Sequence, residues 1–181
     1  MLVQLCRRQD LNETDLDRLR ELALNPEVDI NQDNELNETP LLLLCRANQC
    51  DSLFSALSIL LKNEHIDLTA ITRQNNQTAL TLLCRYYRQN NLIDCVKLLL
   101  KRKVPVDVET RDGRNAFMLL CENFGCENLV EIATLLLSKM VDLRTANLSL
   151  SILRERGFKN ESDTLVVHLR SRRLALAREK K

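Results

Sequence analysis

The stretch TALTLLCR at residues 78–85 decides the fold, because related versions of it recur at regular intervals along the chain. TPLLLLCR stands at residues 39–46, NAFMLLCE stands at residues 115–122, and LCR occurs again at residues 5–7. The cysteines of these stretches are separated by 39, 39 and 37 residues. A period of about 20 to 50 residues is typical of a solenoid, in which each unit buries its apolar face against the next. The sequence therefore predicts an elongated array of repeats.

A second shared segment follows each stretch and completes the repeating unit. Residues 91–100 (NLIDCVKLLL) match residues 128–137 (NLVEIATLLL), and residues 52–61 stand in the same place. The apolar residues of 91–100 fall on one side of a helix. Each unit then ends in IDL, VDV or VDL, whose period of two predicts a short strand before a polar turn. The predicted unit is therefore two helices followed by a short β-hairpin loop.

Local signals place the helix starts and the turns. Thr39 and Thr78 are expected to be N-caps, because a threonine hydroxyl can accept a hydrogen bond from an unpaired helix amide. Pro40 would then occupy the first helical position, where its missing N–H costs little. Gly113 is the only glycine at a loop tip, so asparagine is expected to adopt the left-handed conformation at the other tips.

Composition supports an all-α fold in an intracellular protein. The chain has 181 residues, of which only three are glycine and three are proline, and β-sandwiches or barrels need many more turns of that kind. No apolar run approaches the roughly 18 residues that would span a bilayer, and the N-terminus lacks the pattern of a signal peptide. We expect the protein to be cytoplasmic, nuclear or both.

The seven cysteines are expected to be free and mostly structural. Cys45, Cys84 and Cys121 occupy one repeated apolar position, where a free cysteine packs as a small hydrophobe. No two cysteines have the C-x-x-C spacing typical of zinc sites, so neither a metal nor another cofactor is expected.

The net charge of +1 hides an uneven distribution along the chain. Residues 1–38 carry 4 basic and 10 acidic side chains, whereas residues 144–181 carry 10 basic and 4 acidic ones. If the repeats stack in order, the array is acidic at one end and basic at the other. These ends could be solvated caps, could attract a charged partner, or could attract each other between two copies.

The aligned segments at residues 39–41, 78–80 and 115–117 resemble the ankyrin-repeat family, whose motif is T-P-L-H-x-A. The resemblance implies an ankyrin-like α-solenoid of stacked helix-turn-helix repeats with short β-hairpin loops. The family's period is about 33 residues, so the longer interval here predicts longer helices or an enlarged turn between them. We expect a single domain over residues 1–181, with repeats at about 1–33 (an N-terminal cap), 34–72, 73–111, 112–144 and 145–181 (a C-terminal cap with a basic tail and a last helix at 163–174).

The resemblance implies a non-catalytic module that binds another protein or a peptide on its concave face. Aromatic and arginine side chains are enriched at interface hot spots, and they gather after the first helices and at the loop tips. The candidate binding residues are Arg46, Arg85, Tyr86, Tyr87, Arg88, Glu122, Phe124, Arg73, Arg111 and Arg114. The alternative is that the aromatic rings only cover the helices and that the arginines are solvated.

Other functions have less support in the residues. The two histidines, His65 and His168, lie far apart along a stack, and no phosphate-binding loop is present, so we expect neither an enzyme nor a small-molecule substrate. Two alternatives stay open: self-association through the oppositely charged ends, although a monomer is favoured, and contact with nucleic acid or an acidic partner through the basic last helix. That helix and its tail contain Arg170, Arg172, Arg173, Arg178, Lys180 and Lys181.

Overall fold

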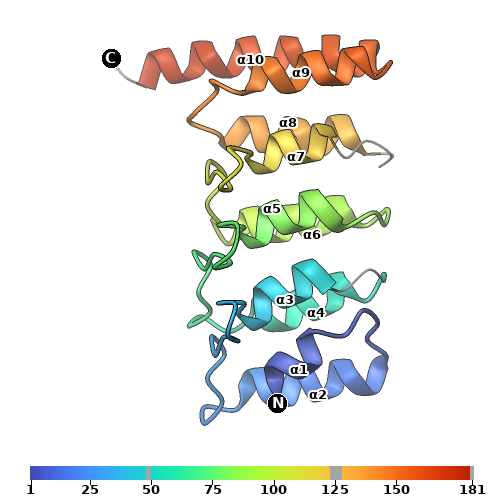
Figure 1. Ribbon diagram of the computed structural model, residues 1–181, viewed down its shortest axis with the longest axis vertical. Helices are drawn as coiled ribbons and strands as arrows, with labels where there is room; N and C mark the ends of the chain where they lie inside the picture. The colour runs from blue at the N-terminus through green and yellow to red at the C-terminus, as the bar shows by residue number, and fades with distance from the viewer. Residues whose placement is uncertain (48–49, 123–127, 180–181) are drawn as a thin grey trace.

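The computed structural model describes residues 1–47, 50–122 and 128–179, and every regular element in these ranges is an α-helix. Each repeat contributes a pair of helices that contact each other, and successive pairs stack along one axis (Figure 1). The helices are α1 (Leu2–Cys6), α2 (Glu13–Leu24), α3 (Pro40–Ala47), α4 (Leu53–Leu60), α5 (Ala79–Tyr86), α6 (Leu92–Lys101), α7 (Ala116–Glu122), α8 (Leu129–Lys139), α9 (Ala146–Glu155) and α10 (Lys159–Glu179).

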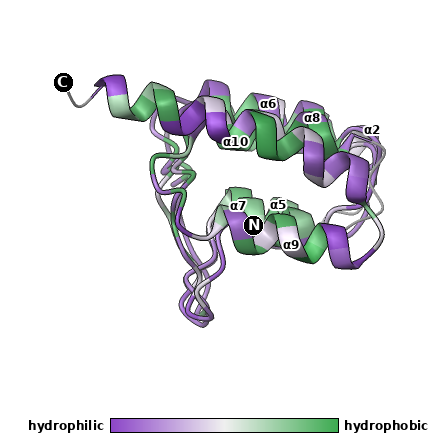
Figure 2. Cartoon of the chain, turned by 90° about the horizontal axis from the view of Figure 1, so that it is seen from above, coloured by the Kyte–Doolittle hydropathy of each residue, from purple (hydrophilic) through white to green (hydrophobic). Residues whose placement is uncertain are grey.

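The stack has two layers of helices. The odd-numbered helices contact one another in sequence order and form the inner layer, and the even-numbered helices form the outer layer in the same way. Seen along the stack, the loops that connect one repeat to the next project past the inner layer (Figure 2). The inner helices and these loops therefore border one continuous surface on the same side of the molecule.

The expected helix starts are confirmed. The Thr78 hydroxyl accepts a hydrogen bond from the amide of Thr81 at 3.2 Å, and the Thr39 hydroxyl lies 3.5 Å from the amide of Leu42. Pro40 is the first residue of α3, as predicted from its missing N–H. Asn115 caps α7 in the same way, because its side-chain oxygen accepts from the amide of Met118 at 2.9 Å.

The repeated cysteines line the core between the stacked pairs. Cys45, Cys84 and Cys121 are at most 1% exposed, which confirms the predicted burial, and Cys6 of α1 is equally buried. Leucines of α3, α5 and α7 fill the space around them in one continuous apolar cluster. Because an interior repeat has a neighbour on both faces, α5 packs against α3 on one side and against α7 on the other.

The turn between the two helices of the repeat at residues 73–111 accounts for its longer period. The inner helix α5 has eight residues, little more than two turns, and five residues separate it from α6. Of the two alternatives that the sequence left open, the enlarged turn is the one observed between α5 and α6.

The loops between repeats have hairpin tips but no β-strand within the described residues. The reason lies in the aspartates of the IDL and VDL segments. The Asp67 carboxylate accepts from the amide of Thr69 at 2.8 Å, and the Asp142 carboxylate accepts from the amide of Arg144 at 3.0 Å. Such turns give the backbone an alternative to a strand ladder, so the predicted strands do not form.

Neighbouring loops are held together at their tips. The amide of Arg73 donates to the carbonyl of Leu36 at 2.9 Å, and the amide of Arg111 donates to the carbonyl of Asn75 at 3.1 Å. Asn37 and Asn76 have positive φ values of 56° and 52°, as Gly113 does at 73°, which confirms that asparagine replaces glycine at the other tips.

The last repeat differs from the others in two ways. Only residues 140–145 connect α8 to α9, whereas residues 102–115 connect α6 to α7, so no loop projects before α9. In addition, α10 has 21 residues and extends beyond the other outer helices on the side of the loops (Figure 1). We call this part of α10, residues 170–179, the overhang.

Candidate protein-binding surface

Most of the candidate residues lie where expected, at the ends of the inner helices and at the loop tips. Arg46 belongs to the last turn of α3, Arg85 and Tyr86 end α5, and Glu122 ends α7. The loops place Arg73 before α5, and Arg111 and Arg114 before α7. Phe124 lies outside the described residues.

Ion pairs within the chain engage several of these charges. In two repeats, the residue just before the N-cap pairs with the residue eight positions later. Glu38, which is only 2% exposed, pairs with Arg46, and Arg114 pairs with Glu122 at 3.0 Å. Gln77 occupies the equivalent position before α5, and there Arg85 lies 3.7 Å from Asp112 of the next loop. These pairs tie α3, α5 and α7 each to a loop.

Asp112 is the centre of one such cluster. The Thr110 hydroxyl donates to its carboxylate, and together with the nearby guanidinium groups of Arg85 and Arg114 this lowers the pKa of Asp112 below its ordinary value. The carboxylate therefore stays ionised at neutral pH and offsets the positive charge of its two arginine neighbours.

Tyr86 offers an aromatic ring to solvent beside a cation. Its side chain is 40% exposed, and the guanidinium carbon of Arg85 lies 6.0 Å from the ring centroid. This distance is at the outer limit of a cation–π contact. The pair presents an aromatic face and a charge together at the end of α5.

Tyr87 is not part of this surface, which corrects the expectation from the sequence. It is 1% exposed, and its hydroxyl donates to the carbonyl of Cys50 at 2.9 Å and to the side chain of Asn91. Tyr87 thus ties the enlarged turn of one repeat to that of the preceding repeat. Arg88 also acts locally, because its guanidinium donates to the carbonyls of Arg85 and Tyr87.

Replacing Tyr87 with phenylalanine should lower stability by about 1–2 kcal/mol, because a half-buried carbonyl and an amide lose their donor. Urea unfolding followed by circular dichroism measures this change. Tyr86→Phe is the matched control, since the neighbouring ring is exposed and its loss of a hydroxyl should be neutral. Equal stability of the two variants would contradict the role given to the Tyr87 hydroxyl.

Arg73 and Arg111 are the candidate cations that remain available to a partner. Both side chains are exposed, and neither forms an ion pair with any described residue. Their backbones occupy equivalent positions in successive loops, as the tip hydrogen bonds show. The two guanidinium groups therefore repeat along the edge of the stack.

Sequence reasoning missed Ile71, which is 41% exposed and lies two residues before Arg73. The aligned residues of the neighbouring loops are Asp33 and Glu109. An aliphatic residue at a position that is acidic in the other repeats is the signal that could have identified it. Ile71 adds an apolar contact beside the free cation of Arg73.

No metal-binding cluster accompanies this surface in the part of the chain that is described. His65 lies in the loop after α4, and His168 lies on α10. Across residues 1–47, 50–122 and 128–179, no three His, Cys, Asp or Glu side chains lie where they could share a metal ion. In the same ranges, no helix combines the length and hydropathy needed to cross a bilayer.

Comparison with known families agrees with the architecture. The family model described as ankyrin repeats in three copies matches residues 52–147, just over half of the chain. No curated protein matches the chain. Ankyrin repeats are generally protein–protein interaction modules and are typically non-enzymatic. With stacked helix pairs, capped inner helices and projecting loops in the same order, the chain belongs to the ankyrin-repeat family.

Proposed function

We propose that this protein is a non-catalytic scaffold, adaptor or inhibitor that binds a partner protein or peptide on the surface bordered by its inner helices and loops. The observation that carries the proposal is the combination of exposed apolar and aromatic side chains with unpaired guanidinium groups. Ile71 and Tyr86 are the exposed apolar and aromatic side chains, and Arg73 and Arg111 carry the guanidinium groups that pair with no described carboxylate. Tyrosine and arginine are the types that dominate binding energy at interfaces.

The charges indicate what the partner should present. Arg46 and Arg114 have carboxylate partners within the chain, so they mainly hold the loops in place. Arg73 and Arg111 have no such partner among the described residues and are offset along the stack by one repeat. A segment with acidic side chains at two positions and an apolar side chain between them would complement this edge.

The proposal includes the division of the chain into repeats and the cellular compartment of the protein. We treat residues 1–181 as one domain of five repeats, with the boundaries expected from the period. Six cysteines of the described residues are free thiols, which suits a reducing compartment such as the cytoplasm or the nucleus.

A triple variant tests the binding surface. Arg73→Glu, Arg111→Glu and Tyr86→Ala together should reduce recovery of bound partner proteins at least tenfold, since they remove the aromatic anchor and reverse two charges. The measurement is quantitative mass spectrometry of proteins that co-purify with the tagged chain.

The control is the double variant Lys62→Glu and Lys101→Glu, which makes the same change in net charge. Both lysines are exposed beside or on the outer layer and form no ion pair with a described residue. If the triple variant recovers the same partners in the same amounts as the control, the inner helices and loop tips are not the binding surface.

A further inference from the structure

We propose that the protein associates with itself head to tail, with the C-terminal end of one copy bound to the N-terminal end of a second copy. The contact would join the overhang of α10 to the first loop, residues 25–39. It uses none of the side chains assigned above to binding other proteins (Ile71, Arg73, Tyr86 and Arg111), so the variants that test the two proposals are different.

The negative charge of the N-terminal region is concentrated in this first loop. Residues 25–39 contain five acidic and no basic side chains. The helices before it are close to neutral, because their charges pair with each other, as Arg18 does with Glu21 and Arg20 does with Asp17. In the loop, Glu27, Asp33 and Glu35 are exposed and form no ion pair with a described residue.

The positive charge of the C-terminal region lies on the overhang. Arg172 is neutralised by Glu179, and its Nε donates to the carbonyl of Met140 at 3.0 Å, which fixes the overhang to the preceding repeat. In contrast, Arg170, Arg173 and Arg178 are exposed, and none of them pairs with a carboxylate of the described residues. Three guanidinium charges thus remain for a second molecule.

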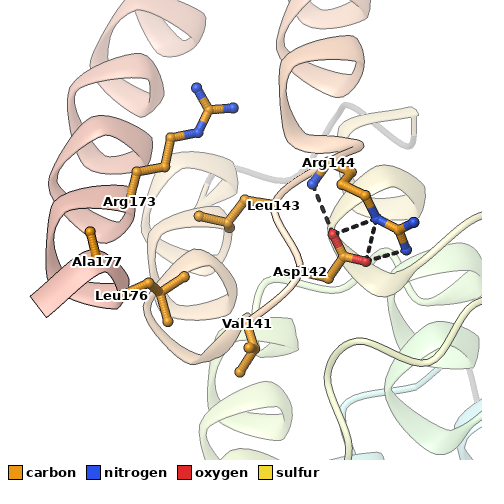
Figure 3. Close-up of a pocket in the computed structure, with 7 residues that line it drawn as sticks. All are labelled: Val141, Asp142, Leu143, Arg144, Arg173, Leu176 and Ala177. Carbon is orange, nitrogen blue, oxygen red and sulfur yellow. Dashed lines mark hydrogen bonds and ion pairs between the residues drawn. The ribbon is translucent and has the colours of Figure 1, made fainter. Parts of the chain in front are cut away.

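A partly apolar pocket lies between the overhang and residues 141–144 (Figure 3). Leu143, Leu176 and Ala177 line it, together with Val141, which is 64% exposed. Arg173 also lines the pocket, as do Asp142 and Arg144, which pair with each other on the side away from α10. The pocket therefore combines four apolar side chains with an internal ion pair and with Arg173, which pairs with no carboxylate of the described residues.

The N-terminal end offers a side chain that fits such a pocket. Leu24 is the last residue of α2, is 70% exposed and directly precedes the acidic loop. An aliphatic side chain followed three residues later by a carboxylate complements a pocket that combines apolar side chains with an unpaired arginine. We therefore assign Leu24 of the second copy as the apolar anchor and Glu27 as a partner of the arginines.

The geometry of the stack makes this contact possible. The start of the first loop and the overhang lie on the same edge of the molecule, at opposite ends of its long axis (Figure 1). Two copies placed end to end would bring these elements next to each other. The terminal repeats also keep exposed apolar side chains, such as Met1 and Leu148, because each has only one neighbouring repeat to cover it.

Sedimentation velocity over a concentration series tests the proposal. At about 50 mM salt the weight-average sedimentation coefficient should rise with concentration beyond the value of a dimer, because a head-to-tail dimer keeps one unused end on each copy. At about 0.5 M salt it should fall to the monomer value, since exposed charges are then screened. A species that stops at a dimer would show a symmetric contact and would overturn the proposal.

Charge reversal locates the contact. Arg170→Glu with Arg173→Glu, and separately Glu27→Lys with Asp33→Lys, should each weaken association at least tenfold. An equimolar mixture of the two variants should restore it, because the reversed charges are again complementary. Lys62→Glu with Lys101→Glu is the control for the first variant and should associate like the wild type.

The apolar part of the proposed contact between copies is tested separately. Leu24→Asp and Val141→Asp change exposed side chains, so both variants should keep the wild-type circular dichroism spectrum and lose association. Association that survives both changes would overturn the proposal, as would a wild-type protein that stays monomeric at about 200 μM in low salt. Association that disappears after nuclease treatment would mean that nucleic acid bridges the copies, which would also overturn it.

Discussion

The Cys84→Asp variant is expected to lose about 4 kcal/mol of stability, a large share of the roughly 5–15 kcal/mol by which a folded domain is stable. Cys84 is 1% exposed and belongs to the central inner helix, α5, which packs against both α3 and α7. A carboxylate at this position would be buried among leucines without a partner. Urea unfolding followed by circular dichroism at 222 nm measures the loss.

Two controls separate the charge from the loss of packing. Cys84→Ala removes only the sulfur atom and should cost about 1–2 kcal/mol, because a small cavity remains. Cys50→Asp introduces the same charge at a partly exposed position in a turn and should cost less than Cys84→Asp. If Cys84→Asp and Cys84→Ala unfold within 1 kcal/mol of each other, the thiols do not occupy a closed apolar core.

The position of Cys84 was predictable from the sequence because stacking forces every repeat to bury the same positions. The repeat period was therefore enough to predict that Cys45, Cys84 and Cys121 lie in the core, although the packing partner of each lies about 39 residues away. The helix starts were predictable for a different reason. Thr78 and Pro40 act through their own backbone neighbours, and such local effects are visible in a single stretch of sequence.

The candidate surface was only partly predictable, because its charges are decided by contacts between elements. Nothing local to Arg85 reveals that Asp112 of the next loop lies 3.7 Å away. Tyr86 and Tyr87 are adjacent and of the same type, yet one is exposed and the other holds the enlarged turn. The direction of each ring follows from where α5 ends, and helix ends are among the least certain features of a sequence pattern.

The length of the last helix was also only partly predictable from the sequence. The last helix was expected at residues 163–174, whereas α10 spans Lys159–Glu179. Its final turns lack a glycine or proline that would stop them, and Leu176 packs onto the core cluster. That tertiary contact extends the helix and creates the overhang on which the proposed self-association depends.

Stability should also fall steeply at alkaline pH, because several thiols are held in their protonated form by burial. Burial raises the pKa of Cys6 and of Cys95 from 9.0 to about 12, and it raises the pKa of Cys45 as well. The unfolded chain would lose these protons near pH 9, whereas the folded chain keeps them up to about pH 12. Between these values the unfolded state binds fewer protons, so a rise in pH favours unfolding.

The size of the expected loss of stability follows from the pKa shift of each thiol. At pH 10, one pH unit above the ordinary value of 9.0, each buried thiol costs about 1.4 kcal/mol, so Cys6 and Cys95 together cost about 3 kcal/mol. Below about pH 8 their contribution is complete and independent of pH. Urea unfolding at a series of pH values, under reducing conditions, measures the slope.

The Cys95→Ala variant isolates one thiol from the other groups that titrate at alkaline pH. The variant keeps every other ionisable side chain of the wild type, so the difference between the two slopes reports on Cys95. Between pH 9.5 and 11, the free energy of unfolding of the variant should therefore fall less steeply than that of the wild type, by about 1.4 kcal/mol per pH unit. Equal slopes would mean that Cys95 ionises as readily in the folded stack as in the unfolded chain. That result would contradict its burial between the two layers, because burial disfavours the charged thiolate.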